Sequence, residues 1–185
     1  MKSALVIVAE GFEEIEALTV VDILRRAGVT CDLCSLQGEV VEGAHGIKVI
    51  CDTFIDHENT ANYDAIILPG GMPGTNNLKN SAHTLDLIRE YYSSGKVIAA
   101  ICAAPIVLAE AGLLKGRTIT SYPTFREDLD NCIYKEDAVI VDENIITSRG
   151  PATALPFALE ILKQLGLFEE EKKLKEDTSF FYSII

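Results

Sequence analysis

Short apolar runs alternate with amphipathic stretches along this chain. Residues 4–9, 65–68 and 97–101 are entirely apolar and have the length of strands, a pattern typical of strands buried on both faces of a parallel sheet. Residues 29–36 predict a further strand. The stretches between the strands predict helices at residues 13–27, 75–80, 82–93, 103–110, 151–165 and 168–175. Strands that alternate with helices predict an α/β sandwich around a mainly parallel sheet.

The other segments predict hairpins and irregular structure. Residues 37–51 and 138–147 each predict a β-hairpin, the second turning across Glu143 and Asn144. Residues 118–120 predict a short strand, residues 52–63 an irregular stretch with a little helix, and residues 122–129 a loop with a helical turn. We expect one domain over residues 1–185 with a peripheral tail at residues 176–185, because this length suffices for one substantial core.

Cys102 stands directly after the predicted strand at residues 97–101 and before a helix with Pro105 in its first turn. A residue at such a corner is pushed out at the carboxyl edge of the sheet, as in the nucleophile elbow of other α/β enzymes. The helix N-terminus favours a thiolate there, and free backbone N–H groups can hold an oxyanion. The alternative is that Cys102 is a small core residue, since free cysteines are often buried.

Two further segments should lie close to Cys102, because ligands gather at the carboxyl ends of the strands in open α/β sheets. These are residues 10–16, after the first strand, and residues 69–74, after a middle strand. Gly70 and Gly71 in the second segment could offer backbone amides as a nest for an anion. Alternatively, they form only a tight turn that needs positive φ.

Glu16 is the acid of greatest interest in the first helix. At 100° per residue it shares a face with Val20 and Ile23, which places a carboxyl on the buried side. Burial raises the pKa of an unpaired acid, and two acids in contact should share one proton. A neutral Glu16 could then donate a hydrogen bond to a thiolate at Cys102. The alternative is a first-turn acid that favours the helix dipole, as we expect for Glu13 and Glu14.

The composition restricts the possible functions of the protein more than it restricts the possible folds. A net charge of −12 argues against nucleic acid or an anionic membrane surface as the main partner. The chain starts directly with a strand, so we expect no signal peptide, and no apolar run approaches the roughly 20 residues that span a bilayer. Five cysteines without the spacing of a disulfide framework favour a reducing cytoplasm.

No pattern of residues predicts a metal or a cofactor. Cys31 and Cys34 have C-x-x-C spacing, but in a strand they point to opposite faces, and no second pair of ligands exists. Neither a phosphate-binding loop nor a dinucleotide-binding glycine motif occurs. The histidines, His45, His57 and His83, fall in predicted turns or helix starts and are expected to be solvated.

Ile15 and Leu18 lie on the otherwise polar side of the first helix, beside Thr19 and Asp22. Exposed apolar side chains on such a face suggest contact with a partner.

Four short motifs carry a family resemblance. They are Glu-Gly-Phe-Glu-Glu-Ile-Glu-Ala at residues 10–17, Leu-Pro-Gly-Gly at 68–71, Ala-Ile-Cys-Ala-Ala-Pro at 100–105 and Thr-Ser-Arg-Gly-Pro-Ala-Thr at 147–153. Together they resemble the DJ-1/PfpI (ThiJ) superfamily, most closely its DJ-1-like branch. The resemblance runs from residue 1 to about residue 167, with the motifs in the same order and spacing.

The resemblance implies a flavodoxin-like α/β sandwich and a site without a cofactor. It implies that Cys102 is a reactive, oxidation-prone cysteine and that Glu16 is the acid that hydrogen-bonds its thiol. Gly71 and Ala103 match the positions whose backbone N–H groups face the reacting oxygen.

The resemblance also implies a homodimer, in which the first helix, with Ile15 and Leu18, forms much of the contact. Arg149 and Pro151 match the segment that lines the pocket in that dimer. Tyr122 departs from the pattern, because many DJ-1-like proteins carry a histidine there before the proline. A phenol can donate a hydrogen bond but is a poor general base near pH 7.

Two departures argue against a peptidase or an amidotransferase. The protease-like branch has a histidine directly after its nucleophile, where this chain has Ala103, and a cysteine peptidase needs an imidazole. Class I glutamine amidotransferases need a His-x-Glu near the C-terminus, which residues 148–157 do not contain.

Three functional hypotheses follow from the resemblance. The leading one is glyoxalase III-like or deglycase activity on methylglyoxal, glyoxal or their early adducts, with small reactive aldehydes as substrates. The second is a stress-responsive, chaperone-like protein whose Cys102 senses oxidants and which has no small substrate. The third, which the substitution by Ala103 disfavours most, is a hydrolase of amides or isonitriles.

Overall fold

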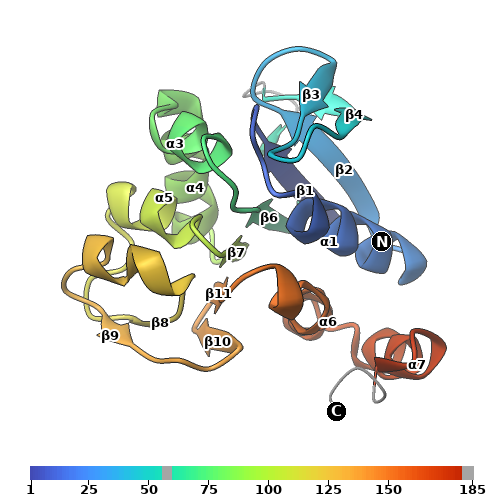
Figure 1. Cartoon of the computed structure of the whole chain (residues 1–185). Coiled ribbons are helices and arrows are strands. Elements are labelled where there is room, and N and C mark those ends of the chain that lie inside the picture. Colours follow the sequence, from blue (N-terminus) through green and yellow to red (C-terminus); the bar gives the residue numbers. More distant parts are fainter. Residues whose placement is uncertain (56–59, 181–185) are drawn as a thin grey trace.

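A seven-stranded sheet crosses the molecule and carries helices on both faces (Figure 1). This computed structural model describes residues 1–55 and 60–180. The order of the strands is β10–β11–β7–β6–β1–β2–β5, and all neighbours are parallel except the β10–β11 hairpin. The strands are β1 (Ser3–Val8), β2 (Thr30–Ser35), β5 (Thr53–Phe54), β6 (Ala65–Leu68), β7 (Val97–Ile101), β10 (Val139–Asp142) and β11 (Ile145–Ser148).

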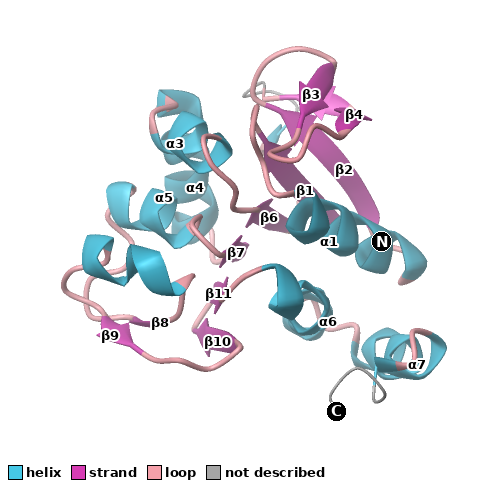
Figure 2. Ribbon diagram, viewed as in Figure 1, coloured by secondary structure: helices cyan, strands magenta, loops and turns pink. Residues whose placement is uncertain are grey.

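The helices form two layers, one on each side of the sheet (Figure 2). Helices α1 (Glu14–Arg26) and α6 (Ala154–Gln164) pack on one face, and α7 (Phe168–Asp177) packs against α6. Helices α3 (Gly74–Lys79), α4 (Ala82–Ser93) and α5 (Pro105–Glu110) lie on the other face. The predicted three-layer, flavodoxin-like α/β sandwich is confirmed.

Alternating side chains of the central strands supply both cores. In β1, Ala4, Val6 and Val8 face α1 and α6, whereas Leu5 and Ile7 face the layer of α4 and α5. All five are fully buried. This is why the central strands are apolar without alternation: neither face of a doubly covered parallel sheet meets water.

Two strands were missed by the sequence analysis. β5 pairs with β2 as an edge strand, inside a stretch that was expected to be irregular; residues 56–59 of that stretch lie outside the described residues. β9 (Ile133–Tyr134) pairs with β8 (Thr118–Ile119) in a small separate sheet. The equally short β8 was predicted within residues 118–120, but a strand of two residues carries little periodic pattern, and β5 and β9 are defined by their pairing partners.

The hairpins were predicted correctly. Strands β3 (Val40–Glu42) and β4 (Lys48–Ile50) form the first hairpin, above α1 in Figure 1. The second is β10–β11. The expected helical turn is a 3₁₀ helix, η1 (Pro123–Asp128), and a further 3₁₀ turn, η2 (Pro151–Thr153), leads into α6.

Two predicted boundaries were wrong. The helix after Cys102 begins at Pro105 rather than at residue 103, because Cys102 itself has a left-handed backbone and residues 103–104 complete the turn. The tail is less peripheral than expected: α7 extends to Asp177, and Phe180 packs against the core on the α1–α6 face.

Among the described helices, none combines the length and the apolar character that crossing a bilayer requires.

Candidate functional site

Cys102 occupies a strained corner between β7 and α5. Its φ is 63°, a left-handed conformation that is uncommon for a residue with a side chain. The corner is held on both sides: its N–H donates to the Ser148 carbonyl at 3.0 Å, and its carbonyl accepts from the Tyr122 N–H at 2.9 Å. Cys102 as a residue is partly exposed. The predicted elbow geometry is therefore present.

Glu16 and Cys102 meet at Gly70. Glu16 is completely buried on α1, and its Oε2 accepts the Gly70 N–H at 2.7 Å. A Cβ at Gly70 would lie 2.7 Å from the Cys102 Cβ and 2.8 Å from Glu16 Oε2. Glycine is therefore required where the loop after β6 passes between the acid and the thiol.

The Glu16 carboxyl is short of partners. Its Oε1 is buried without a hydrogen bond of standard geometry in the described part of the chain. The Cys102 thiol is the side chain with which the carboxyl interacts. An acid with one free buried oxygen beside a thiol is placed to exchange a proton with it.

Burial controls the protonation of this pair. It raises the pKa of Glu16 to about 7, against the smaller opposing effect of the Gly70 N–H. Burial, followed by the negative charge of Glu16, raises the pKa of Cys102 above its ordinary value. The expectation that the helix N-terminus lowers the thiol pKa is therefore wrong for the unliganded site, since desolvation and the neighbouring acid outweigh it. Because the pKa of Cys102 is raised above that of Glu16, the proton that the pair keeps near neutrality belongs to the thiol, and the neighbouring carboxylate can take it.

Two backbone N–H groups point at the sulfur. Those of Ala103 and Gly71 lie close enough to the sulfur to favour the thiolate, and they partly offset the rise in the pKa of Cys102. Gly71 has φ of 89°, and a side chain there would collide with the backbone of the loop before α1. Gly71 therefore makes the predicted tight turn, and its role in holding an anion stays a prediction. The predicted nest was wrong for Gly70, because the Gly70 N–H donates to Glu16 Oε2.

The predicted pocket residues lie near the same corner. The Tyr122 ring covers Gly150, whose Cβ would lie 3.2 Å from Tyr122 Cδ2, and the ring is 43% exposed. Arg149 adjoins the Ser148 carbonyl that anchors Cys102, and its Nη1 is buried without a partner in the described residues. Pro151 begins η2.

One interaction near the site was missed from the sequence. Glu14 is buried, not solvated; its Oε1 accepts the His45 N–H at 2.7 Å and its Oε2 lies 2.8 Å from His45 Nδ1. Burial opposes ionisation of Glu14, but the hydrogen bonds from His45 and its neighbours lower the pKa overall. This contact ties the β3–β4 hairpin to α1. His45 is thus paired rather than free, and no local pattern could reveal a partner 31 residues away.

Potential metal ligands in the described residues form one group, Glu13, Glu14 and His45, whose ligand atoms lie within 4.8 Å of one another. Both oxygens of Glu14 already accept hydrogen bonds there, so the group is explained by the hairpin contact. His83 is exposed on α4, as predicted, and His57 lies outside the described residues. Cys31 and Cys34 face opposite cores, as expected for a strand.

The fold and this corner define a class: flavodoxin-like α/β proteins with a cysteine at a strand-to-helix elbow and a buried acid beside it. The sequence profile of the DJ-1/PfpI family matches residues 2–164. The chain belongs to the DJ-1/PfpI family.

Individual relatives agree with this assignment. The chain is 40% identical to protein dj-1beta of Drosophila melanogaster over 98% of its own length and 99% of the relative's. The crystal structure of Drosophila melanogaster DJ-1beta superimposes with a TM-score of 0.92, at 41% identity, covering 96% of this chain and 97% of that one. A structure of oxidized Toxoplasma gondii DJ-1 gives a TM-score of 0.92 at 37% identity, covering 96% and 98%.

Proposed function

We propose that the protein converts methylglyoxal-type aldehydes without a cofactor, as a glyoxalase III-like or deglycase enzyme. The observation that carries the proposal is the convergence of the Cys102 sulfur, the Glu16 carboxyl and the N–H groups of Gly71 and Ala103. These groups supply a nucleophile, a proton carrier and an oxyanion site, which are the parts that addition to a carbonyl requires.

The first step is addition. The Glu16 carboxylate takes the proton of the Cys102 thiol as the sulfur attacks the aldehyde carbon. The N–H groups of Gly71 and Ala103 stabilise the developing oxyanion, which then takes the proton from Glu16 to give a hemithioacetal. A carboxyl with a pKa of about 7 suits both giving and taking a proton near neutrality.

The second step moves hydrogen between neighbouring carbons. The Glu16 carboxylate removes the proton from the former aldehyde carbon, and the electron pair passes to the adjacent ketone as an enediol. Return of the proton to the second carbon gives a thioester of lactate, which water hydrolyses to lactate and the free thiol. One carbon is oxidised and its neighbour is reduced, so the sequence balances without an external oxidant or reductant.

Lactate formation from methylglyoxal tests this proposal. We expect turnover by the wild type and loss of about a hundredfold or more in Cys102→Ser and Glu16→Gln, as for removal of a nucleophile or a general acid–base group. Cys132→Ser is the matched control, because Cys132 is also a free, partly exposed cysteine remote from Glu16 in the fold. Equal rates for wild type and Cys102→Ser would remove Cys102 from the mechanism.

A second candidate function is oxidant sensing by Cys102. It is favoured by the same two N–H groups, which can stabilise a sulfinate as well as an alkoxide, and by the existence of an oxidized form of the related Toxoplasma gondii DJ-1. Intact mass after mild peroxide separates the two functions. A selective gain of two oxygens at Cys102, together with no aldehyde turnover, favours the sensor.

We further propose a homodimer through α1. Ile15 is 55% exposed and Leu18 is 37% exposed on this helix. Burying these apolar side chains against a second copy would remove them from water, which favours association. Sedimentation of the wild type against Ile15→Glu tests this: the wild type should sediment as a dimer and the variant as a monomer.

The cytoplasm is the compartment we propose for this activity. All five cysteines are free, and thiols persist unpaired in a reducing compartment.

A further inference from the structure

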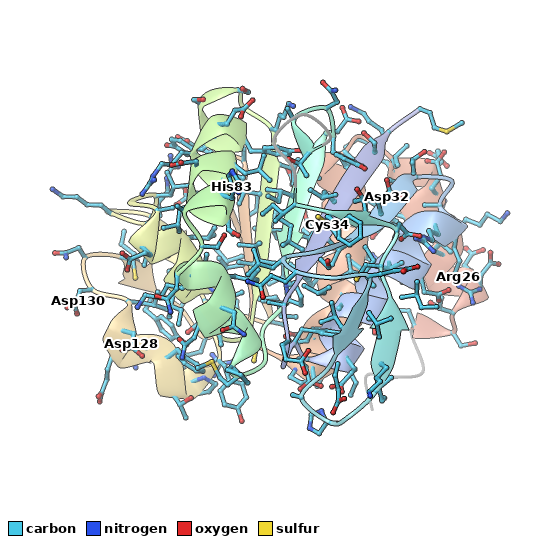
Figure 3. All side chains as sticks on the ribbon, turned by 90° about the horizontal axis from the view of Figure 1, so that it is seen from above. Arg26, Asp32, Cys34, His83, Asp128 and Asp130 are labelled. Atoms are coloured by element: carbon cyan, nitrogen blue, oxygen red, sulfur yellow. The ribbon has the colours of Figure 1, made fainter. Side chains whose placement is uncertain are left out.

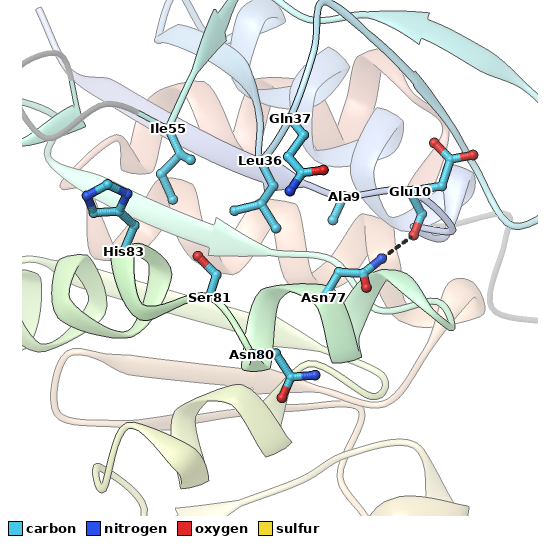
Figure 4. A pocket seen from close by; sticks show the side chains of 9 residues that line it. All are labelled: Ala9, Glu10, Leu36, Gln37, Ile55, Asn77, Asn80, Ser81 and His83. Carbon is cyan, nitrogen blue, oxygen red and sulfur yellow. Dashed lines mark hydrogen bonds between the residues drawn. The ribbon is translucent and has the colours of Figure 1, made fainter.

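A cavity of about 700 Å³ opens at the carboxyl ends of β1 and β2, beside the junction of α3 and α4 (Figure 4). Its lining consists of Ala9, Glu10, Leu36, Gln37, Ile55, Asn77, Asn80, Ser81 and His83. None of these residues belongs to the site around Cys102. The carboxyl edge of a parallel sheet is where ligands of α/β proteins gather, and the volume is that of a small-molecule site.

The lining is polar but nearly uncharged. It contains three side-chain amides, one hydroxyl, one imidazole and a single carboxylate, that of Glu10. The described residues that line it include no lysine, no arginine and no Phe, Tyr or Trp. Among these described residues, a phosphate or carboxylate ligand would find no lysine or arginine to pair with, and a nucleobase would find no phenyl, phenol or indole ring to stack on.

Several of these polar groups have free hydrogen-bonding capacity. Within the described chain, the side chains of Gln37 and His83 make no hydrogen bond, and both are exposed. Asn77 donates from Nδ2 to the Glu10 carbonyl at 3.1 Å, which leaves its Oδ1 available. In Figure 4, Gln37 and Asn77 approach the space from opposite walls, and Figure 3 shows His83 on α4.

An apolar strip completes the cavity. Leu36 and Ile55 are half-buried and lie between Gln37 and His83 in Figure 4. The cavity therefore offers amides that both donate and accept around a small apolar surface. A hydroxyl group also donates and accepts, and the C–H face of a sugar ring is apolar.

We propose that this cavity binds a neutral, polyhydroxylated small molecule of monosaccharide size. Gln37, Asn77 and His83 hydrogen-bond its hydroxyl groups, and Leu36 and Ile55 pack against its C–H face. The site is separate from Cys102 and does not depend on the proposed aldehyde chemistry.

Ligand-observed NMR with D-glucose tests the proposal, using saturation transfer and a titration of the full chain. We expect a dissociation constant on the order of millimolar, typical of a few exposed hydrogen bonds. Gln37→Ala and His83→Ala should each weaken binding about fivefold, the value of one hydrogen bond. Asn76→Ala is the matched control: it removes an exposed amide from α3 that does not line this cavity, so binding should be unchanged.

Glucose 6-phosphate distinguishes the chemistry of recognition. It should bind more weakly than glucose, because the described lining residues include no lysine or arginine to compensate its charge. Two results would overturn the proposal. One is no detectable binding of glucose at millimolar concentrations, in about 100-fold excess over the protein. The other is equal binding by the wild type and the Gln37→Ala/His83→Ala double variant. Tighter binding of glucose 6-phosphate would also overturn it.

Discussion

Replacing Glu16 by glutamine should remove a pH dependence from the stability of the protein. Burial raises the pKa of Glu16 in the folded chain from 4.5 to about 7. Because the raised pKa belongs to the folded state, the neutral acid is favoured by folding and the carboxylate is disfavoured. The stability that neutral Glu16 contributes to the folded state is fully present below pH 4.5 and is lost as the pH rises to about 7.

The magnitude follows from the difference in pKa. A rise from 4.5 to about 7, at about 1.4 kcal/mol per unit, corresponds to about 3 kcal/mol of stability. Glu16 is completely buried, so solvent screens little of this. The glutamine variant keeps a carbonyl oxygen that can accept the Gly70 N–H, which limits other changes.

Denaturant unfolding of both proteins between pH 4 and pH 8.5 measures the effect. The free energy of unfolding of the wild type, minus that of Glu16→Gln, should fall by about 3 kcal/mol between pH 4.5 and 7 and stay level above. Glu14→Gln is a control of opposite sign on the same helix. Because hydrogen bonds lower the pKa of Glu14, its stabilising contribution is present above the unfolded pKa and is lost as the pH falls through the folded one.

Parallel stability curves for the wild type and Glu16→Gln would refute the reasoning. They would mean that Glu16 ionises with an ordinary pKa in the folded state, and hence that no proton is shared with Cys102. The aldehyde mechanism would then lack its proton carrier.

Three further outcomes are expected. Gly70→Ala should lower the free energy of unfolding by about 1–3 kcal/mol through overpacking and abolish the reactivity of Cys102. The reason is that the new Cβ at position 70 would lie 2.7 Å from the Cys102 Cβ. Thermal melting measures the first effect and thiol labelling the second. Arg117→Ala should lower the free energy of chemical unfolding by about 2–4 kcal/mol. The partly buried Arg117 guanidinium contacts Asp142, Glu143 and Tyr92, and a loss under about 0.5 kcal/mol would contradict a stabilising role for these contacts. The hydrogen bond to Glu14 raises the pKa of His45, so NMR titration of His45 in Glu14→Gln should show that pKa moving down, and an unchanged value would exclude the contact.

Much of the fold could be predicted from the sequence because its signals are local. The run at residues 97–101 is apolar at every position, which is required of a strand covered on both faces. The buried face of α1 could likewise be counted from the helical period. These patterns also placed Glu16 in the first turn of α1 and Cys102 directly after β7.

The edges of the fold were not predictable in the same way. β5 and β9 are two residues long, and such strands exist only because a neighbouring strand satisfies their backbone groups. Likewise, the Glu14–His45 contact joins a helix to a hairpin far along the chain. Pairings of this kind leave no trace in a single stretch of sequence.

The sequence by itself therefore determined the layered architecture and the positions of Cys102 and Glu16 in it, since periodicity and corner position are local properties. Only the tertiary structure decided the chemistry of that pair. The pKa of Glu16 depends on complete burial and on the Gly70 amide, and that of Cys102 depends on burial and on the acid. Desolvation is a property of the surrounding atoms, which come from segments far apart in the sequence, and for this reason it overrode the effect that the helix N-terminus alone predicts.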